Sequence, residues 1–192
     1  MSALEQHLAG LRNALDEVGE LEGPLQAAAD SIARSFLAGG TLLAAGNGGS
    51  AAEAQHLTGE LIGRLHPDRE RGGLPAVALH ADTSALTAVA NDYGYEQIFA
   101  RQVEALGRVG DVLVVLSTSG ASKNLVGAVD VANARGMVTV GLLGRGARPL
   151  HDRCTHVLAV PADDTQTIQE CHLVLIHVLV EQVEDILGGS DE

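Results

Sequence analysis

One stretch of the sequence organises the rest of the chain: Gly46-Asn47-Gly48-Gly49-Ser50-Ala51-Ala52-Glu53-Ala54-Gln55-His56-Leu57-Thr58-Gly59-Glu60. It follows the apolar run 42–45, which predicts a short buried strand, and its alanine-rich second half predicts a helix. A strand, a glycine-rich turn and a helix start in this order favour anion binding, because backbone N–H groups at the helix start are free to bind a phosphate. Ser50 is predicted to be the N-cap of this helix, with Glu53 three residues later completing a capping box.

The same predicted helix carries a candidate acid/base pair. His56 and Glu60 are four residues apart and therefore lie on one face of the helix. Neither feature is sufficient alone, because glycine-rich turns are common after strands and a His/Glu pair at this spacing is also typical of a solvated helix face. No lysine follows the last glycine, so the turn is not a Walker loop, and its spacing is not that of the dinucleotide fingerprint.

The composition restricts the fold and the class of partner. The 192 residues suffice for one α/β domain, and aromatic residues make up only 2%, so Ala, Leu, Val and Ile must form the core, as in helices packed on a parallel sheet. The formal charge of −13 argues against nucleic-acid and anionic membrane partners. Cys154 and Cys171 do not suggest a disulfide framework, and neither a signal peptide nor a membrane-spanning segment is expected, since no run of about 20 apolar residues exists. These features favour a cytoplasmic protein.

The first 38 residues predict helix in two pieces, with a break at Gly19 and the Gly23-Pro24 pair. Leu4, Leu8, Leu11 and Leu15 recur at helical spacing. Because these helices precede the first strand, residues 1–38 are predicted to form an arm that packs on the domain and on another subunit. Packing within one chain is the alternative. Residues 39–187 are predicted to form the main domain, and residues 188–192 a frayed tail.

Strands and helices alternate over the main domain. Strands are predicted at 41–45, 76–79, 111–116, 137–142 and 157–160, and helices at 49–64, 82–90, 96–106, 123–134 and 166–187. A turn is predicted at 91–95, and the polar loop 66–73 is predicted to be mobile, with basic residues that could help to hold an anion. This pattern predicts a three-layer α/β/α sandwich with a five-stranded parallel sheet.

A second candidate phosphate site follows the most apolar strand. The run 111–116 leads directly into Ser117-Thr118-Ser119-Gly120-Ala121-Ser122, where four hydroxyls lie within six residues. Ser122 is the predicted cap of the following helix. Hydroxyls and free helix N–H groups can together bind a phosphate monoester, although an ordinary Ser/Thr-rich cap would have the same sequence.

Five motifs together resemble a known family, over residues 25 to 187. They are Gly46-Asn47-Gly48-Gly49-Ser50, His56 with Glu60, Asn91-Asp92-Tyr93-Gly94, Ser117-Thr118-Ser119-Gly120 with Ser122, and Ile168-Gln169-Glu170 with His172 and His177. In this order and spacing they resemble the phosphoheptose isomerases, which have the sugar-isomerase (SIS) fold. Thr167 stands where relatives often carry Arg, and this departure leaves the choice of substrate and product anomer open.

The resemblance implies an activity, an assembly and a set of site residues. It implies a homotetramer with interfacial active sites that converts D-sedoheptulose 7-phosphate to D-glycero-D-manno-heptose 7-phosphate, the first step toward activated heptose. Glu60 matches the catalytic base and His177 the second acid/base group. Substrate contacts are implied for Asn47, Gly48, Gly49, Ser50, Glu60, Asp92, Ser117, Thr118, Ser119, Ser122 and Gln169. In some members zinc is bound by the residues that match His56, Glu60, Gln169 and His177.

The residues are consistent with this chemistry. An aldose–ketose isomerisation needs a base near two adjacent carbons and an acid near their oxygens, roles that suit Glu60 and His177. Two imidazole nitrogens with Glu and Gln oxygens also form a plausible zinc set. Gln169 and His177 differ by about 80° in rotation on an ideal helix, so a site shared between subunits is expected.

Alternatives remain at single residues and for the whole chain. His172 is a rival ligand that ranks below His177, packing is the favoured role of His172 and Cys171, and Cys154 is predicted to be structural. A non-catalytic SIS protein that binds a replication initiator or senses sugar phosphates is the alternative function. The presence of both Glu60 and His177 favours the enzyme.

Overall fold

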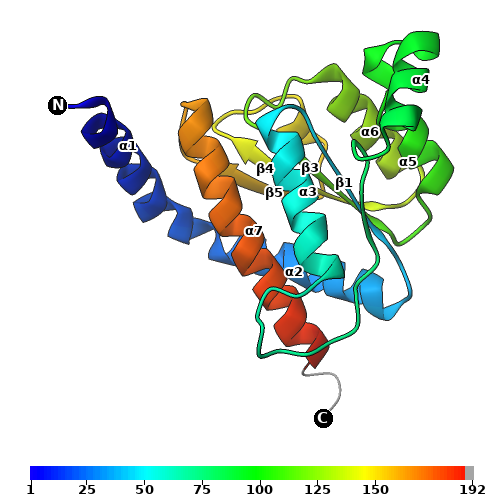
Figure 1. Ribbon diagram of the computed structural model, residues 1–192, viewed down its shortest axis with the longest axis horizontal. Helices are drawn as coiled ribbons and strands as arrows, with labels where there is room; N and C mark the ends of the chain where they lie inside the picture. Colours follow the sequence, from blue (N-terminus) through cyan, green and yellow to red (C-terminus); the bar gives the residue numbers. More distant parts are fainter. Residues whose placement is uncertain (189–192) are drawn as a thin grey trace.

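The centre of the structure is a five-stranded sheet, seen in a computed structural model that describes residues 1–188 (Figure 1). Its strand order is β2-β1-β3-β4-β5, and every neighbouring pair is parallel. The strands are β1 (Leu42–Gly46), β2 (Ala76–Ala78), β3 (Val112–Ser117), β4 (Val138–Gly144) and β5 (His156–Val160). The predicted fold class and all five strands are therefore confirmed, with ends that differ by one or two residues.

The order of the strands determines where a ligand can enter. β1 and β3 are neighbours, with Gly46 in register with Leu116, but the chain leaves them toward opposite edges of the sheet. Parallel sheets bind ligands at such a reversal, outside the carboxyl ends of the two strands. The two candidate phosphate loops, which directly follow β1 and β3, are thus brought side by side.

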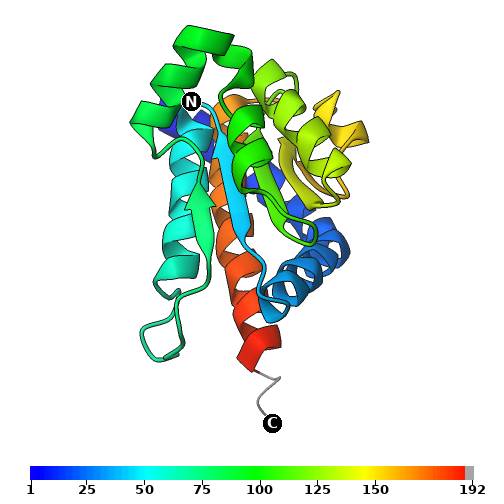
Figure 2. The ribbon, with the colours of Figure 1, turned by 90° about the vertical axis from the view of Figure 1, so that its right-hand side faces the viewer.

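Helices cover both faces of the sheet (Figure 2). One face packs against α2 (Glu22–Leu37), α3 (Gly49–Ile62) and α7 (Thr165–Gly188), and the other against α5 (Ala100–Leu106) and α6 (Lys123–Ala134). Side chains alternate between the two cores along each strand, as the pleat requires. Leu42 and Ala44 face the first core, and Leu43 and Ala45 the second. Small aliphatic residues fill both cores, in accordance with the composition.

The N-terminal region consists of two helices, as predicted, with the break at Gly19, but the predicted break at Gly23-Pro24 is wrong because both residues lie in the first turn of the second helix. They are α1 (Ala3–Val18) and α2, joined by the short 3₁₀ helix η1 (Gly19–Leu21). α2 buries Leu25, Ala28 and Ile32 in the first core, whereas α1 lies along α7 and projects away from the sheet (Figure 1). The role of residues 1–38 in assembly stays a prediction. The predicted frayed tail begins at Gly188, where α7 ends, and residues 189–192 lie outside the described residues.

The region after β2 differs from its prediction. α4 (Thr83–Tyr93) is capped by Asp82, whose carboxylate accepts a hydrogen bond from the Ala85 N–H at 2.9 Å. The predicted turn at 91–95 is wrong, because α4 continues through Tyr93 and ends only at Gly94, which has a φ of +87°. The 3₁₀ helix η2 (Tyr95–Gln97) then precedes α5, so the helix predicted at 96–106 is divided. A third 3₁₀ helix, η3 (Leu150–Asp152), precedes β5.

Among the helices of residues 1–188, none combines the length and the apolar character that a membrane crossing requires.

Candidate active site

The glycine-rich turn between β1 and α3 forms the first wall of the site. α3 begins at Gly49, with Gly48 as its N-cap at a φ of +58° and no side-chain cap. Ser50 is therefore the second residue of the helix, and the predicted capping box is wrong. Because the helix starts two residues earlier than an N-cap at Ser50 requires, Ser50 is buried (4% exposed), and Glu53 faces His172 on α7 instead of the helix start.

Close packing of this turn explains its lack of side chains. A Cβ atom at Gly46 would lie 2.2 Å from the Ser50 carbonyl oxygen, and one at Gly49 would lie 2.5 Å from Nε2 of Gln169. The start of α7 therefore lies directly against the start of α3. Gln169 donates a hydrogen bond from Nε2 to Ser50 Oγ at 3.4 Å, which links two of the residues predicted to bind substrate.

An amide network joins the glycine-rich turn to the start of α6. Asn47 and Asn124 exchange hydrogen bonds, Nδ2 to Oδ1 at 3.0 Å in one direction and 2.9 Å in the other. The Tyr95 hydroxyl donates to Oδ1 of Asn47 at 2.9 Å. Asn124 is buried at the start of α6, so it locks Asn47 in one orientation. Nothing in the sequence marks Asn124 or Tyr95, because their partners come from distant segments.

The hydroxyl loop after β3 forms the second wall. Ser117 Oγ accepts a hydrogen bond from the Gly120 N–H at 3.0 Å, and Ser119 Oγ accepts one from Ala121 at 3.3 Å. Ser122 is the N-cap of α6, as predicted, but its side chain makes no capping bond. Its hydroxyl and the first N–H groups of α6 can therefore serve a ligand. Thr118, in the same loop, is half-buried.

Three titratable side chains converge from two helices. His56 and Glu60 on α3 and His177 on α7 offer ligand atoms that all lie within 4.8 Å of one another. Nε2 of His56 lies 2.9 Å from Nε2 of His177 and 3.5 Å from Oε1 of Glu60. Glu60 and His177, which the sequence places 117 residues apart, thus meet in one cluster.

The donor set of this cluster suits a zinc ion. Tetrahedral zinc with Zn–N distances of about 2.0–2.1 Å brings neighbouring ligand atoms to about 3.3 Å from one another. The separations of 2.9 and 3.5 Å lie close to that value, and two nitrogens and one oxygen are donors that zinc prefers. Gln169 lies about 12 Å from His177 along the axis of α7, by the rise of 1.5 Å per residue. Its amide contacts Ser50, so its role as a ligand stays a prediction.

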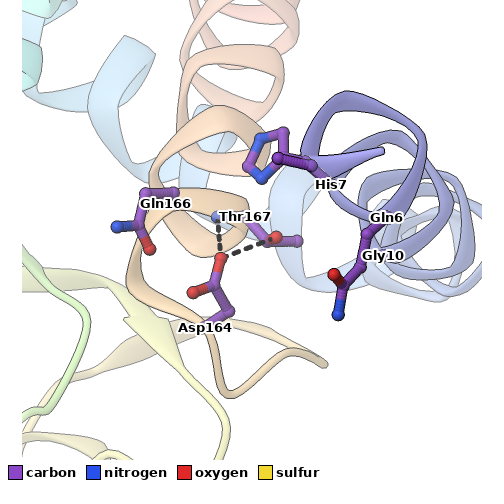
Figure 3. A pocket seen from close by; sticks show the side chains of 7 residues that line it. Gln6, His7, Gly10, Asp164, Gln166 and Thr167 are labelled. Carbon is purple, nitrogen blue, oxygen red and sulfur yellow. Dashed lines mark hydrogen bonds between the residues drawn. The ribbon is translucent and has the colours of Figure 1, made fainter. Parts of the chain in front are cut away.

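Two clefts lie along α7, and one of them adjoins His56 and Gln169. One, of about 440 Å³, lies between α3 and α7 and is lined by Gly49, Glu53, His56 and Gln169, among others. The other, of about 640 Å³, lies between α1 and the start of α7 (Figure 3). There Asp164 accepts hydrogen bonds from the Thr167 N–H and hydroxyl, both at 3.0 Å, and these bonds lower the pKa of Asp164. A carboxylate held ionised makes this second cleft unsuitable for a phosphate.

The remaining predicted residues lie elsewhere in the chain. Asp92 is exposed on α4 and accepts a hydrogen bond from Asn91 at 2.8 Å, so its contact with substrate stays a prediction. His172 is fully buried, with Nε2 3.3 Å from the Leu143 carbonyl oxygen, and does not join the cluster. Burial raises the pKa of the Cys154 thiol to about 12, and burial followed by the charge of Glu170 raises the pKa of Cys171. Both cysteines therefore have the character of packing residues.

Comparisons with known proteins agree with this architecture. A model of the SIS domain matches residues 6–144. The phosphoheptose isomerase of Burkholderia pseudomallei is 51% identical over 166 residues, which cover 86% of this chain and 83% of that protein. The chain belongs to the phosphoheptose isomerase family.

Solved structures of phosphoheptose isomerases extend the likeness to the whole fold. The structure from Neisseria gonorrhoeae has a TM-score of 0.88 at 41% identity and covers 95% of this chain and 97% of its own. The structure from Francisella tularensis has a TM-score of 0.89 at 35% identity, with coverages of 96% and 100%. The family likeness inferred from the five sequence motifs is confirmed.

Proposed function

We propose that this phosphoheptose isomerase converts D-sedoheptulose 7-phosphate to D-glycero-D-manno-heptose 7-phosphate, the first step toward activated heptose. The observation that carries the proposal is the meeting of Glu60 and His177 in one cluster. Glu60 lies eleven residues after Gly49, or about 16 Å along α3, so the loops after β1 and β3 of a neighbouring subunit are proposed to complete the site. A carboxylate and an imidazole are the acid/base groups that an aldose–ketose isomerisation needs.

The two loops bind the phosphate in this proposal. The net charge of −13 repels an anionic substrate at long range, so binding requires donors at close range. The N–H groups of Gly49 at the start of α3 and of Lys123 and Asn124 at the start of α6 bond no carbonyl of the described residues and provide them, together with hydroxyls from both loops. These hydroxyls belong to Ser50, Ser117, Thr118, Ser119 and Ser122. Asn47, held by Asn124, and the glycines Gly48 and Gly49 complete the wall on the β1 side.

The acid/base pair then moves two protons. Glu60 takes the proton from C1 of the ketose and returns it to C2, which passes the sugar through an enediol. His177 gives a proton to the C2 oxygen and accepts one from the C1 oxygen. An imidazole has one nitrogen that can donate a proton and one that can accept a proton, so it can serve the two oxygens in turn.

We further propose that the cluster of His56, Glu60 and His177 holds zinc, with Gln169 of a neighbouring subunit as the fourth ligand. When bound, the ion would polarise the sugar carbonyl as a Lewis acid. His56 has no other role in the mechanism, and its imidazole faces His177 edge-on with ring centroids 5.1 Å apart. The chemistry of the donors supports this assignment.

The assembly is proposed to be a homotetramer with its active sites at subunit interfaces. In a single chain Gln169 and Asp92 do not join Glu60 and His177, and a neighbouring subunit would supply the missing contacts. We place the reaction in the cytoplasm, since both cysteines are free. No nucleic-acid or membrane partner is proposed.

A non-catalytic SIS protein, which would bind a replication initiator or sense sugar phosphates, is the less favoured candidate. Such a protein needs the fold and the phosphate loops but no acid/base pair. Retention of both Glu60 and His177 in one cluster supports the isomerase instead.

Replacement of the base tests the proposal. Glu60→Gln keeps the shape of the side chain but removes the carboxylate, so kcat should fall by about 10²- to 10⁴-fold. Sedoheptulose 7-phosphate is incubated in D2O and followed by NMR, which should detect deuterium at C2 of the aldose with the wild type and almost none with the variant. Glu17→Gln, the same change at an exposed position on α1, is the control. Near-normal turnover by Glu60→Gln removes Glu60 as the base, and an inactive wild type removes the proposed substrate.

A further inference from the structure

The loop between α3 and β2, residues 63–75, is fastened to α7 by ion pairs. Arg69 pairs with Asp185, His66 lies 3.3 Å from Glu181, and Arg71 pairs with Glu184. The prediction that basic residues of this loop help to hold an anion is not supported, because both arginines are already paired with carboxylates of the same chain. The three acids lie on one face of α7, at the spacing of adjacent turns.

Arg71 makes the most extensive of these contacts. Its Nε and Nη2 atoms lie 2.8 and 2.7 Å from Oε1 of Glu184. Nη1 donates to the Leu61 carbonyl oxygen and Nη2 to the Glu60 carbonyl oxygen, each at 2.8 Å. The Arg71 side chain is 15% exposed and that of Glu184 only 3%. A planar guanidinium can make all these bonds at once, which a lysine ammonium cannot.

These contacts join the two helices that carry the acid/base cluster. The last carbonyl groups of a helix have no partner within it, and Arg71 satisfies two of them in the final turn of α3, one belonging to Glu60 itself. Glu184 lies seven residues after His177, or about 10 Å along α7. One side chain therefore fixes the backbone of Glu60 relative to the helix that carries His177.

Glu184 depends on Arg71 in turn. Besides Arg71, Oε1 of Glu184 accepts a bond from the Leu65 N–H at 3.3 Å, whereas Oε2 is buried and makes no hydrogen bond to the described residues. A buried carboxylate requires a charged partner, so loss of Arg71 would displace Glu184 and the segment of α7 around it. The neighbouring pair of Arg69 and Asp185 is about half exposed, and exposed pairs contribute little.

We propose that Arg71, together with Glu184, is a positioning residue that sets the separation of Glu60 and His56 from His177. Arg71 touches no reacting atom. The proposal rests on the isomerase function proposed above. An error of about 1 Å in the position of a catalytic group can cost about 100-fold in rate, so a link of this kind acts on turnover rather than on substrate binding.

Kinetics of matched variants test the proposal. Arg71→Met should lower kcat by about 10- to 100-fold, with KM within about threefold of the wild type, because Arg71 does not contact the phosphate loops. Arg71→Lys should recover only part of this loss, and Glu184→Gln should resemble Arg71→Met. The control Arg69→Met, in the same loop, should keep kcat within about twofold. In the double variant Arg71→Met/Glu184→Gln, kcat should fall no further than in the lower single variant.

All assays are made well below the Tm of each variant, so that a folding defect does not appear as a loss of turnover. If Arg71→Met does not fold, the kcat values of Arg71→Lys and Glu184→Gln test the positioning role instead. The positioning role would be overturned by any of three results in folded variants. These are an unchanged kcat, a fall in kcat equal to that of Arg69→Met, or a raised KM with normal kcat. Crystal structures of wild type and Arg71→Met give a readout without turnover: an unchanged His56–His177 separation overturns the proposal even if sedoheptulose 7-phosphate is not the substrate.

Discussion

His56 and His177 present Nε2 atoms to each other at 2.9 Å, with Glu60 beside them. Two imidazole nitrogens at this distance either share one proton or direct both lone pairs at a cation. Glu60 adds a negative charge to the same space, which favours a cation. The same arrangement of side chains can therefore accommodate either a metal ion or a shared proton between the two imidazoles.

Metal removal should lower the activity. Dialysis against a chelator, verified by elemental mass spectrometry, should reduce kcat by an order of magnitude or more, and added zinc should restore it, because the carbonyl loses its Lewis acid. His56→Ala should abolish stoichiometric zinc binding, whereas His151→Ala, an exposed histidine outside the cluster, should not. Full activity in demonstrably metal-free enzyme would make zinc non-essential.

Sequence reasoning at the residue scale succeeded where spacing or family likeness carries the information. His56 and Glu60 share a helix face by their spacing alone, and the resemblance added His177. Arg71, Asn124 and Tyr95 could not be predicted, because their partners lie in segments far away in the sequence. The choice of such partners is a property of tertiary packing.

At the scale of elements, His7 on α1 makes a polar contact with Glu170 on α7, and His7 also lines the second cleft (Figure 3). Nε2 of His7 lies 2.8 and 3.0 Å from the two carboxylate oxygens of Glu170, and Asp164 faces the same ring. The hydrogen bond to Glu170 raises the pKa of His7. Glu170 also lines the cleft between α3 and α7, so the position of α1 is linked to a wall of the active site.

The docking of α1 should consequently depend on pH. A histidine whose pKa is raised on folding stabilises the folded state below its unfolded pKa of about 6.5, and this contribution is lost as the pH rises through the folded pKa. His7→Gln should therefore lower the Tm at pH 6 but leave it almost unchanged at pH 9. Calorimetry of the wild type and His7→Gln at pH 6 and pH 9 measures the difference in Tm between the two proteins. Titrations common to both proteins cancel in this difference. An equal shift at both pH values would contradict the ionic origin of the contact.

Errors in predicted elements occurred where local preferences competed with packing. Ser50 has the sequence of an N-cap, but the helix begins earlier because Gly48 can adopt a positive φ. Residues 91–93 are typical turn formers, yet they continue α4 until Gly94 ends it. Strand existence was easier to predict than strand ends, since the central strands β1 and β3 are apolar runs buried on both faces.

For the whole molecule, the sequence predicted the layers but not the order of the strands. Alternating apolar runs and helical patterns suffice for a three-layer sandwich, whereas the order β2-β1-β3-β4-β5 depends on contacts between distant segments. That order matters most for function, because it places the loops after β1 and β3 together. The resemblance to a family supplied this information indirectly.

The surface of the single chain favours an assembly. The structure describes every residue of α4, and none of them is buried. Leu4 and Leu15 are exposed on α1. Light scattering should give a mass about four times the 19.8 kDa of one chain. Leu4→Asp with Leu15→Glu should reduce this mass and kcat together if the active sites are interfacial, whereas Val109→Asp, at a more exposed position near β3, should not. A fully active monomer would contradict the proposed tetramer.

The edge of the sheet at β2 limits how copies can associate. This strand has only three residues, and Val77 at its centre is partly exposed. So short an edge offers too few free backbone groups for two sheets to join into one continuous sheet. In the proposed tetramer, contacts between copies are therefore expected on helical surfaces such as those of α1 and α4 rather than at the β2 edge, so substitutions that weaken the assembly should lie on these helices.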